Sequence, residues 1–241
     1  MTGAWVDWFD RYRYLTRTTA TVALTTVPLV LLYGLGLLWA SPAAQSGVDI
    51  ISTPILERLP VASYIGVQFA IATALLFVAF FRREETIGSH LRWTFPALGE
   101  AALWGFGTGA IVIAALDEIH VISTTPADSL SLWLDLAVVS AGAGLHEEFV
   151  FRLVLIPLVT WALVATVGVE RWAAVVGAIA LSSLVFSLAH HLAGETFDLY
   201  VFAFRSVAGL FFATLYVTRG FAIAAWAHAI YDFQILSQLT G

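Results

Sequence analysis

Long apolar runs recur along this chain from residue 19 to its C-terminus, and only short breaks separate them. A helix that crosses the hydrocarbon core of a bilayer needs about 20 mainly apolar residues, and several runs reach that length. Hydrophobic residues make up 60% of the 241 residues and charged residues 12%, whereas an ordinary soluble domain has about 25% charged residues. We therefore expect a single membrane domain over residues 1–241, surrounded by the lipid bilayer, and no soluble domain.

The breaks between the runs contain proline and glycine, which end helices or turn the chain. This pattern predicts an all-α, polytopic transmembrane bundle of about eight helices. The predicted helices cover residues 19–41, 61–81, 97–117, 130–146, 149–168, 172–190, 199–217 and 221–237.

Arginine placement predicts the orientation of the bundle in the cell membrane. Three arginines precede the first helix and three more lie between the second and third helices, and basic residues mark the cytoplasmic side. With an even number of helices, both termini are then predicted to be cytoplasmic, residues 1–18 forming a cytoplasmic segment. The first apolar run is longer than the roughly 7–15 residues of a secretory signal, so we expect it to be retained.

Composition excludes several classes of function. Cysteine is absent, which removes disulfides, thiolate metal sites and a cysteine nucleophile. The net charge is −6 and no basic stripe with interleaved aromatic residues is present, so nucleic acid is not an expected partner.

The first of three polar segments within the apolar runs contains two adjacent acids and an arginine. Glu148 and Arg152 are four residues apart, so on a helix they share a face and can pair, while Glu147 points about 100° away. The alternative is that both acids only begin a helix, where the dipole favours carboxylates. An arginine one turn later within an apolar run favours the first interpretation, in which Glu147 is left for chemistry.

The other two segments each place a histidine and a second residue on one helical face. Phe186 and His190 are four residues apart, as are His228 and Asp232. Taken singly, a histidine at a helix end or a His–Asp pair is most simply structural. Taken with a free carboxylate, they are the groups needed to activate water and to stabilise an oxyanion.

Other hydrolytic mechanisms fit the sequence less well. A zinc motif of the H-E-x-x-H kind that starts at His146 needs histidine at position 150, which is Val150. No Gly-x-Ser-x-Gly elbow is present for a serine nucleophile. Asp135 and Asp232 are available for an aspartyl dyad, but their surroundings share no motif.

Together the three segments resemble the signature of the CPBP intramembrane proteases, which include the type II CAAX prenyl endopeptidases and bacteriocin-processing or self-immunity proteins. The resemblance covers about residues 130–237, which form the predicted protease core. It is carried, in the family's order, by Glu147-Glu148-x-x-x-Arg152, Phe186-x-x-x-His190 and His228-x-x-x-Asp232.

The resemblance implies a glutamate-dependent intramembrane endopeptidase with its polar catalytic cavity inside the bundle. Glu147 and His190 would activate the attacking water, and His228 with residue 232 would support the oxyanion. Glu148 and Arg152 would build the site or hold the substrate. That substrate would be a membrane-embedded or lipidated peptide or protein, such as a prenylated C-terminus, a bacteriocin-like peptide or a sorting helix.

One position departs from the family pattern. The family's third motif usually ends in asparagine, and this chain has Asp232. An ionised carboxylate cannot donate a hydrogen bond to an oxyanion, so Asp232 must either be protonated or act by orienting His228.

The same residues leave alternatives open. Glu147, His190 and His228 are also a zinc ligand set with an open position. We expect no cofactor to be required, because a glutamate and a histidine suffice for general-base work and no pattern of supporting residues for zinc is visible. Buried ionisable residues also serve proton-coupled transporters, and a third alternative is a non-catalytic scaffold.

A few polar and small residues outside the motifs carry weaker expectations. Glu100 and Arg205 are expected to line the cavity or to pair with each other or with Asp198. His90 is expected in a solvated loop. The Gly105-x-x-x-Gly109 pattern predicts close helix packing.

Overall fold

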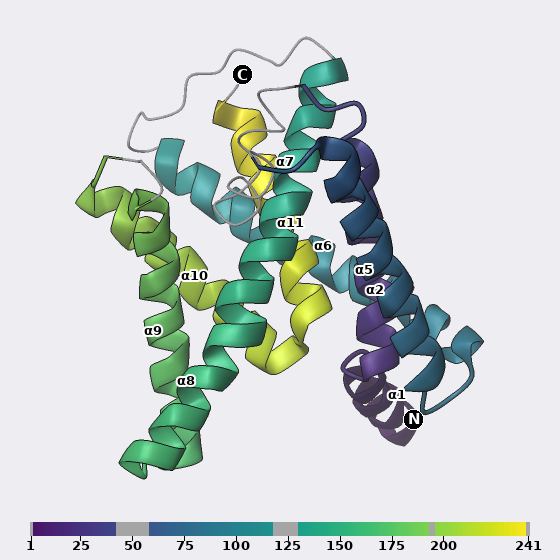
Figure 1. The fold of residues 1–241 in the computed structure, drawn as a ribbon. Helices are drawn as coiled ribbons and strands as arrows, with labels where there is room; N and C mark the ends of the chain where they lie inside the picture. The colour runs from purple at the N-terminus through teal and green to yellow at the C-terminus, as the bar shows by residue number, and fades with distance from the viewer. Residues whose placement is uncertain (1, 42–57, 118–129, 193–195, 240–241) are drawn as a thin grey trace.

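The chain is described by a computed structural model over residues 2–41, 58–117, 130–192 and 196–239, and every regular element in these ranges is helical. This confirms the predicted all-α class (Figure 1). The N-terminal elements are α1 (Thr2–Leu15), α2 (Thr19–Gly36), α5 (Val61–Phe81) and α6 (Ile87–Asp117). The C-terminal elements are α7 (Leu130–Glu148), the π-helix η1 (Phe149–Leu155), α8 (Ile156–Ala162), the π-helix η2 (Leu163–Val167), α9 (Arg171–Leu192), α10 (Leu199–Arg219) and α11 (Phe221–Leu239).

The chain is a multi-pass membrane protein. Among the described residues, five helical segments are long and apolar enough to cross a bilayer. They are Thr19–Gly36, Val61–Phe81, Ser131–Val167, Arg171–Leu192 and Leu199–Arg219.

The break predicted between residues 146 and 149 is wrong. The chain runs through α7, η1, α8 and η2 as one helical span of 37 residues, Ser131–Val167. The two acids do not end a helix there: their carboxylates lie beside histidines of α9 and α11, and the backbone continues with π turns. The merged span removes one crossing from the count on which the prediction of two cytoplasmic termini was based, and that orientation stays a prediction. Figure 1 shows α1 and the end of α11 at opposite ends of the bundle.

Helix α6 begins ten residues before its predicted start and continues through Pro96. His90 consequently lies within the helix and is buried, not solvated. Its Nδ1 atom is 2.9 Å from the Thr21 hydroxyl, and its Nε2 atom accepts a hydrogen bond of 3.2 Å from the backbone N–H of Glu85. The expectation of a loop failed because Pro96 was taken as the end of a break.

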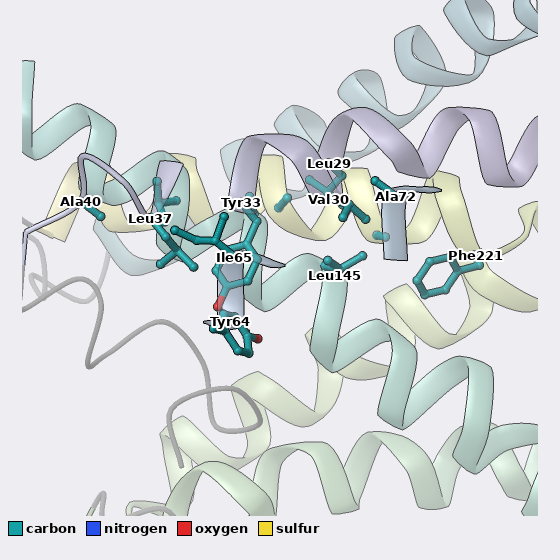
Figure 2. Packing of buried hydrophobic residues seen from close by; sticks show 14 residues of the cluster. Leu29, Val30, Tyr33, Leu37, Ala40, Tyr64, Ile65, Ala72, Leu145 and Phe221 are labelled. Carbon is teal, nitrogen blue, oxygen red and sulfur yellow. Dashed lines mark hydrogen bonds between the residues drawn. The ribbon is translucent and has the colours of Figure 1, made fainter. Parts of the chain in front are cut away.

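The largest core joins α2, α5, α7 and α11. Figure 2 shows Tyr33 and Leu29 of α2 and Ile65 of α5 in this core, with Leu145 of α7 and Phe221 of α11. Helix α11 contacts α7, α6, α2 and α10, so it is surrounded by the bundle that positions it.

Small residues allow α11 to approach its neighbours closely. A Cβ atom on Gly105 would lie 2.7 Å from the carbonyl oxygen of Ala227, and one on Gly109 would meet the side chain of Gln234. The predicted packing role of the Gly105-x-x-x-Gly109 pattern is therefore confirmed. On the other side of α11, a Cβ atom on Gly144 would lie 2.5 Å from the carbonyl oxygen of Ala225.

Glu100 has a different partner from the predicted ones. Its carboxylate accepts hydrogen bonds of 2.6 and 2.7 Å from Arg219, at the end of α10. Tyr12 of α1 also donates to Glu100, and burial together with this carboxylate raises the pKa of Tyr12. Helix α1 is thus held against α6 and α10 by a polar cluster rather than left as an unattached segment.

Substitution of Gly144 by alanine tests the close approach of α7 to α11. The new methyl group would meet the backbone of α11, and overpacking of this kind costs about 1–3 kcal/mol. We expect the unfolding midpoint of G144A in detergent to fall clearly below that of the wild type. Gly107 provides a matched control, because a Cβ atom there meets nothing within 4 Å; G107A should be neutral or slightly stabilising. Equal midpoints for the two variants would contradict the proposed packing.

Candidate active site

Three parts of the chain that are far apart in the sequence, α7 with η1, α9 and α11, bring the predicted site residues together. Helix α11 contacts α7 and η1, and α9 contacts η1. Along the chain, the site residues are Glu147 and Glu148 of α7, Arg152 of η1, Phe186 and His190 of α9, and His228 and Asp232 of α11.

Glu148 lies at the centre of a buried polar cluster. The NH1 atom of Arg152 is 3.2 Å from Glu148 Oε1, and both side chains are fully buried. The Nδ1 atom of His228 is 2.8 Å from the same oxygen. Since a carboxylate only accepts hydrogen bonds, Nδ1 of His228 is assigned as the donor. The predicted pairing of Glu148 with Arg152 is therefore present, and His228 shares the same carboxylate.

Arg152 also has partners on α9 and α10. Its NH2 group donates to the carbonyl oxygen of Gly209 at 3.3 Å, and its guanidinium lies 4.5 Å from the centre of the Phe186 ring. A cation over an aromatic face is attracted by the quadrupole of the ring. A Cβ atom on Gly209 would approach within 3.2 Å of Phe186 and of Ser183, so this glycine lets α10 come close to α9. One arginine thus connects three elements.

Glu147 lies between two imidazole rings. Its Oε1 atom is 3.6 Å from His190 Nε2, and its Oε2 atom is 3.9 Å from His228 Nε2. As the sequence predicts, Glu147 points away from the Arg152 pair. The side chain of Glu147 is almost fully buried, whereas the side chain of His190 is 16% exposed. His190 is therefore the more exposed partner of this carboxylate.

The backbone contact of His190 indicates that its Nδ1 atom carries a hydrogen. Its Nδ1 atom lies 3.0 Å from the carbonyl oxygen of Phe186. A carbonyl only accepts, so Nδ1 is assigned the hydrogen, and a neutral ring then turns the lone pair of Nε2 toward Glu147. In the neutral ring, Nε2 and the carboxylate of Glu147 are therefore two proton acceptors that face each other.

Asp232 is placed to orient His228. Its Oδ2 atom is 3.4 Å from His228 Nε2, one helical turn away. The imidazole of His228 is thus contacted by Glu148 at one nitrogen and by Glu147 and Asp232 at the other. The ring is also stacked on Phe212 of α10, with centroids 4.6 Å apart and planes at 16°.

The π-helix η1 follows directly after Glu148. The hydroxyl of Ser182 in α9 donates to the carbonyl oxygen of Phe151 in η1 at 2.6 Å. π turns inside α-helices occur frequently at functional sites. Ser182, Gly209 and Phe212 were not predicted as site residues, because a serine, a glycine or a phenylalanine in an apolar helix gives no distinctive signal.

The three side chains of the zinc alternative come from α7, α9 and α11. Within residues 2–41, 58–117, 130–192 and 196–239, no group of three or more His, Asp or Glu side chains is arranged to hold a metal ion. Glu147, His190 and His228 are neighbours, but they do not form such a group in this conformation.

A family model described as type II CAAX prenyl endopeptidase Rce1-like matches residues 129–234. This segment runs from α7 into α11 and contains all seven predicted site residues. No curated protein and no solved structure matches the chain.

Replacement of Ser182 by alanine tests the link between α9 and the π-helix. A side-chain hydrogen bond between membrane helices contributes about 1 kcal/mol, so S182A should lower the unfolding midpoint and speed hydrogen exchange in residues 149–155. The control is S183A, because the hydroxyl of Ser183 donates only to Ile179 of its own helix and such local bonds add little. Unchanged exchange in S182A would show that Ser182 does not hold η1.

Proposed function

We propose that this chain, whose residues 129–234 match the type II CAAX prenyl endopeptidase family model, is a CPBP intramembrane endopeptidase in which Glu147 and His190 activate the attacking water. The observation that carries this proposal is the position of Glu147. Its carboxylate is buried between two imidazoles, and its contact with His190 lies at the accessible edge. The comparisons give no support to a proton-coupled transporter.

In the proposed reaction, a water molecule lies between Glu147 and Nε2 of His190. These two acceptors take a proton as the water oxygen forms a bond to the scissile carbonyl carbon. When the C–N bond breaks, the same proton passes to the leaving amine, so the products are a carboxylic acid and a free amine. Burial of Glu147 strengthens its attraction for the water proton, because little other solvent competes.

His228 is proposed to stabilise the oxyanion that forms in this step. Its Nδ1 atom is committed to Glu148 at 2.8 Å, which fixes the direction of Nε2. When Nε2 carries a proton, it can donate to the developing negative charge. Arg152 holds Glu148 in place, and Asp232 lies beside Nε2 and orients the ring. We therefore assign Glu148, Arg152, Phe186 and Asp232 to positioning rather than to direct contact with the reacting atoms.

The proposed substrate is a lipidated peptide of the CAAX type. The support is the name of the matching family model, and a CAAX substrate carries a prenylated cysteine followed by three C-terminal residues. Bacteriocin-like peptides and sorting helices are the other substrates considered. The proposed location is the cell membrane, with α1 on the cytoplasmic side, because arginines gather in and near α1 and in the connection from α5 to α6.

Removal of either proposed base should abolish cleavage. With a farnesylated CAAX peptide as substrate, we expect E147Q and H190A to lower kcat by about 10²–10⁴-fold, the usual contribution of a positioned acid or base. E170Q, at an exposed position just before α9, is the matched control and should keep wild-type activity.

The same assay separates the remaining alternatives. A non-prenylated peptide tests the need for the lipid, and a chelator should leave the wild-type rate unchanged. Loss with chelator and recovery with zinc would instead assign Glu147, His190 and His228 as metal ligands. Full activity in both folded variants, E147Q and H190A, would refute the protease mechanism proposed here.

Substitutions of Asp232 test its positioning role. In D232N the amide oxygen can still accept from His228 Nε2, so we expect kcat/KM to remain close to that of the wild type. In D232L this contact is lost, and a misplaced imidazole should cost about 100-fold. The pH profile of kcat/KM provides the second measurement: D232L should change its shape, whereas a purely structural role would lower the rate at every pH alike.

A further inference from the structure

A lipid-facing groove lies along α8 on the outside of the bundle, with a volume of about 650 Å³. One wall is formed by Leu153, Trp161 and Val164, which are all exposed and apolar. The other wall and the floor come from the start of α2 and from the turn between α10 and α11, where Tyr216 and Phe221 lie. Nothing in the proposed reaction uses this groove.

The length of the groove matches one leaflet of a bilayer. Its wall on α8 and the flanking π-helices runs from Leu153 to Ala165, which at 1.5 Å per residue is about 18 Å. The hydrocarbon core of a bilayer is about 30 Å thick, so one leaflet provides about 15 Å. An acyl chain can therefore lie along the groove from the end of the bundle toward the middle of the membrane.

Both charged side chains that line the groove are arginines. Arg17 precedes α2, and Arg171 begins α9. The start of α2 and the start of α9 both lie at the end of the bundle that carries α1 (Figure 1). Arg17 donates one hydrogen bond to the carbonyl oxygen of Val217 at 3.2 Å, and a guanidinium has further donors for a ligand. The acid next to Arg171 in the chain, Glu170, is exposed and does not line the groove.

We propose that this groove binds one phospholipid with an anionic headgroup. The headgroup phosphate lies at Arg17 and Arg171, and an acyl chain lies against Leu153, Trp161 and Val164. Arginine matches phosphate in geometry and charge, and basic pockets between transmembrane helices are binding sites for anionic lipid headgroups. A neutral lipid would fill the apolar part equally well but would supply no net negative charge to the two arginines.

The groove and the candidate active site adjoin the same helical span but are lined by different residues of it. Leu153, which lines the groove, follows Arg152, which is buried in the site. A lipid bound there would brace η1 and α8 from outside while leaving the approach to Glu147 open.

The experiment compares lipids on the full chain. The purified protein is delipidated in a neutral detergent and titrated with phosphatidylglycerol or phosphatidylcholine, and binding is measured by native mass spectrometry and by the unfolding midpoint. We expect one tightly bound phosphatidylglycerol and a higher midpoint with phosphatidylglycerol than with phosphatidylcholine. In R17Q/R171Q, loss of two attractions to the phosphate should weaken phosphatidylglycerol binding by about 30-fold.

Two further variants keep the result interpretable. V164W fills the apolar wall without changing charge and should also weaken lipid binding. Because Arg17 is unchanged in this variant, weaker binding cannot result from a folding defect caused by its loss. R82Q/R92Q removes two exposed arginines outside the groove and should bind like the wild type. Equal affinity for the two lipids, retained binding in R17Q/R171Q, or displacement of the lipid by a farnesylated peptide would each overturn the proposal.

Discussion

The buried pair of Glu148 and Arg152 is the interaction on which the rest of the site depends. A charge in the hydrocarbon region is stable only with partners close to it, and both of these side chains are fully buried. The partners of this pair come from every element around the site: His228 from α11, Phe186 from α9 and the carbonyl of Gly209 from α10. The contacts of this one ion pair therefore connect three helices to η1. The same arrangement leaves Glu147 without an arginine partner and beside His190. The contacts that pack the helices therefore also position the proposed catalytic carboxylate.

Sequence reasoning predicted the parts of the site that depend on helical periodicity. The pairs Glu148–Arg152 and His228–Asp232 are each four residues apart and do meet in the structure. Periodicity also separated Glu147 from Glu148, because neighbours on a helix differ by about 100°. These predictions succeeded because they need only the local geometry of one helix.

The contacts between helices could not be predicted in this way. The hydrogen bond from Ser182 to Phe151 and the stacking of Phe212 on His228 depend on how distant segments pack. The partner of Glu100 was missed for the same reason, since Arg219 is brought to it by the approach of α10 to α6. The predicted break at residues 147–148 failed because adjacent acids in an apolar run were read as a helix end. The local sequence does not predict their partners on α9 and α11.

The π turns after Glu148 have a consequence for how this chain compares with its relatives. Each π turn holds one residue more than an α turn, and one residue corresponds to about 100° of rotation around a helix. The faces of α8 are therefore rotated relative to those of α7 from what a continuous α-helix would give. A relative that lacks one residue within 149–155 could keep its glutamates facing the histidines and still present a different set of side chains to lipid further along. Insertions and deletions in this short segment thus offer evolution a means to change the outer surface of the span without disturbing the inner one.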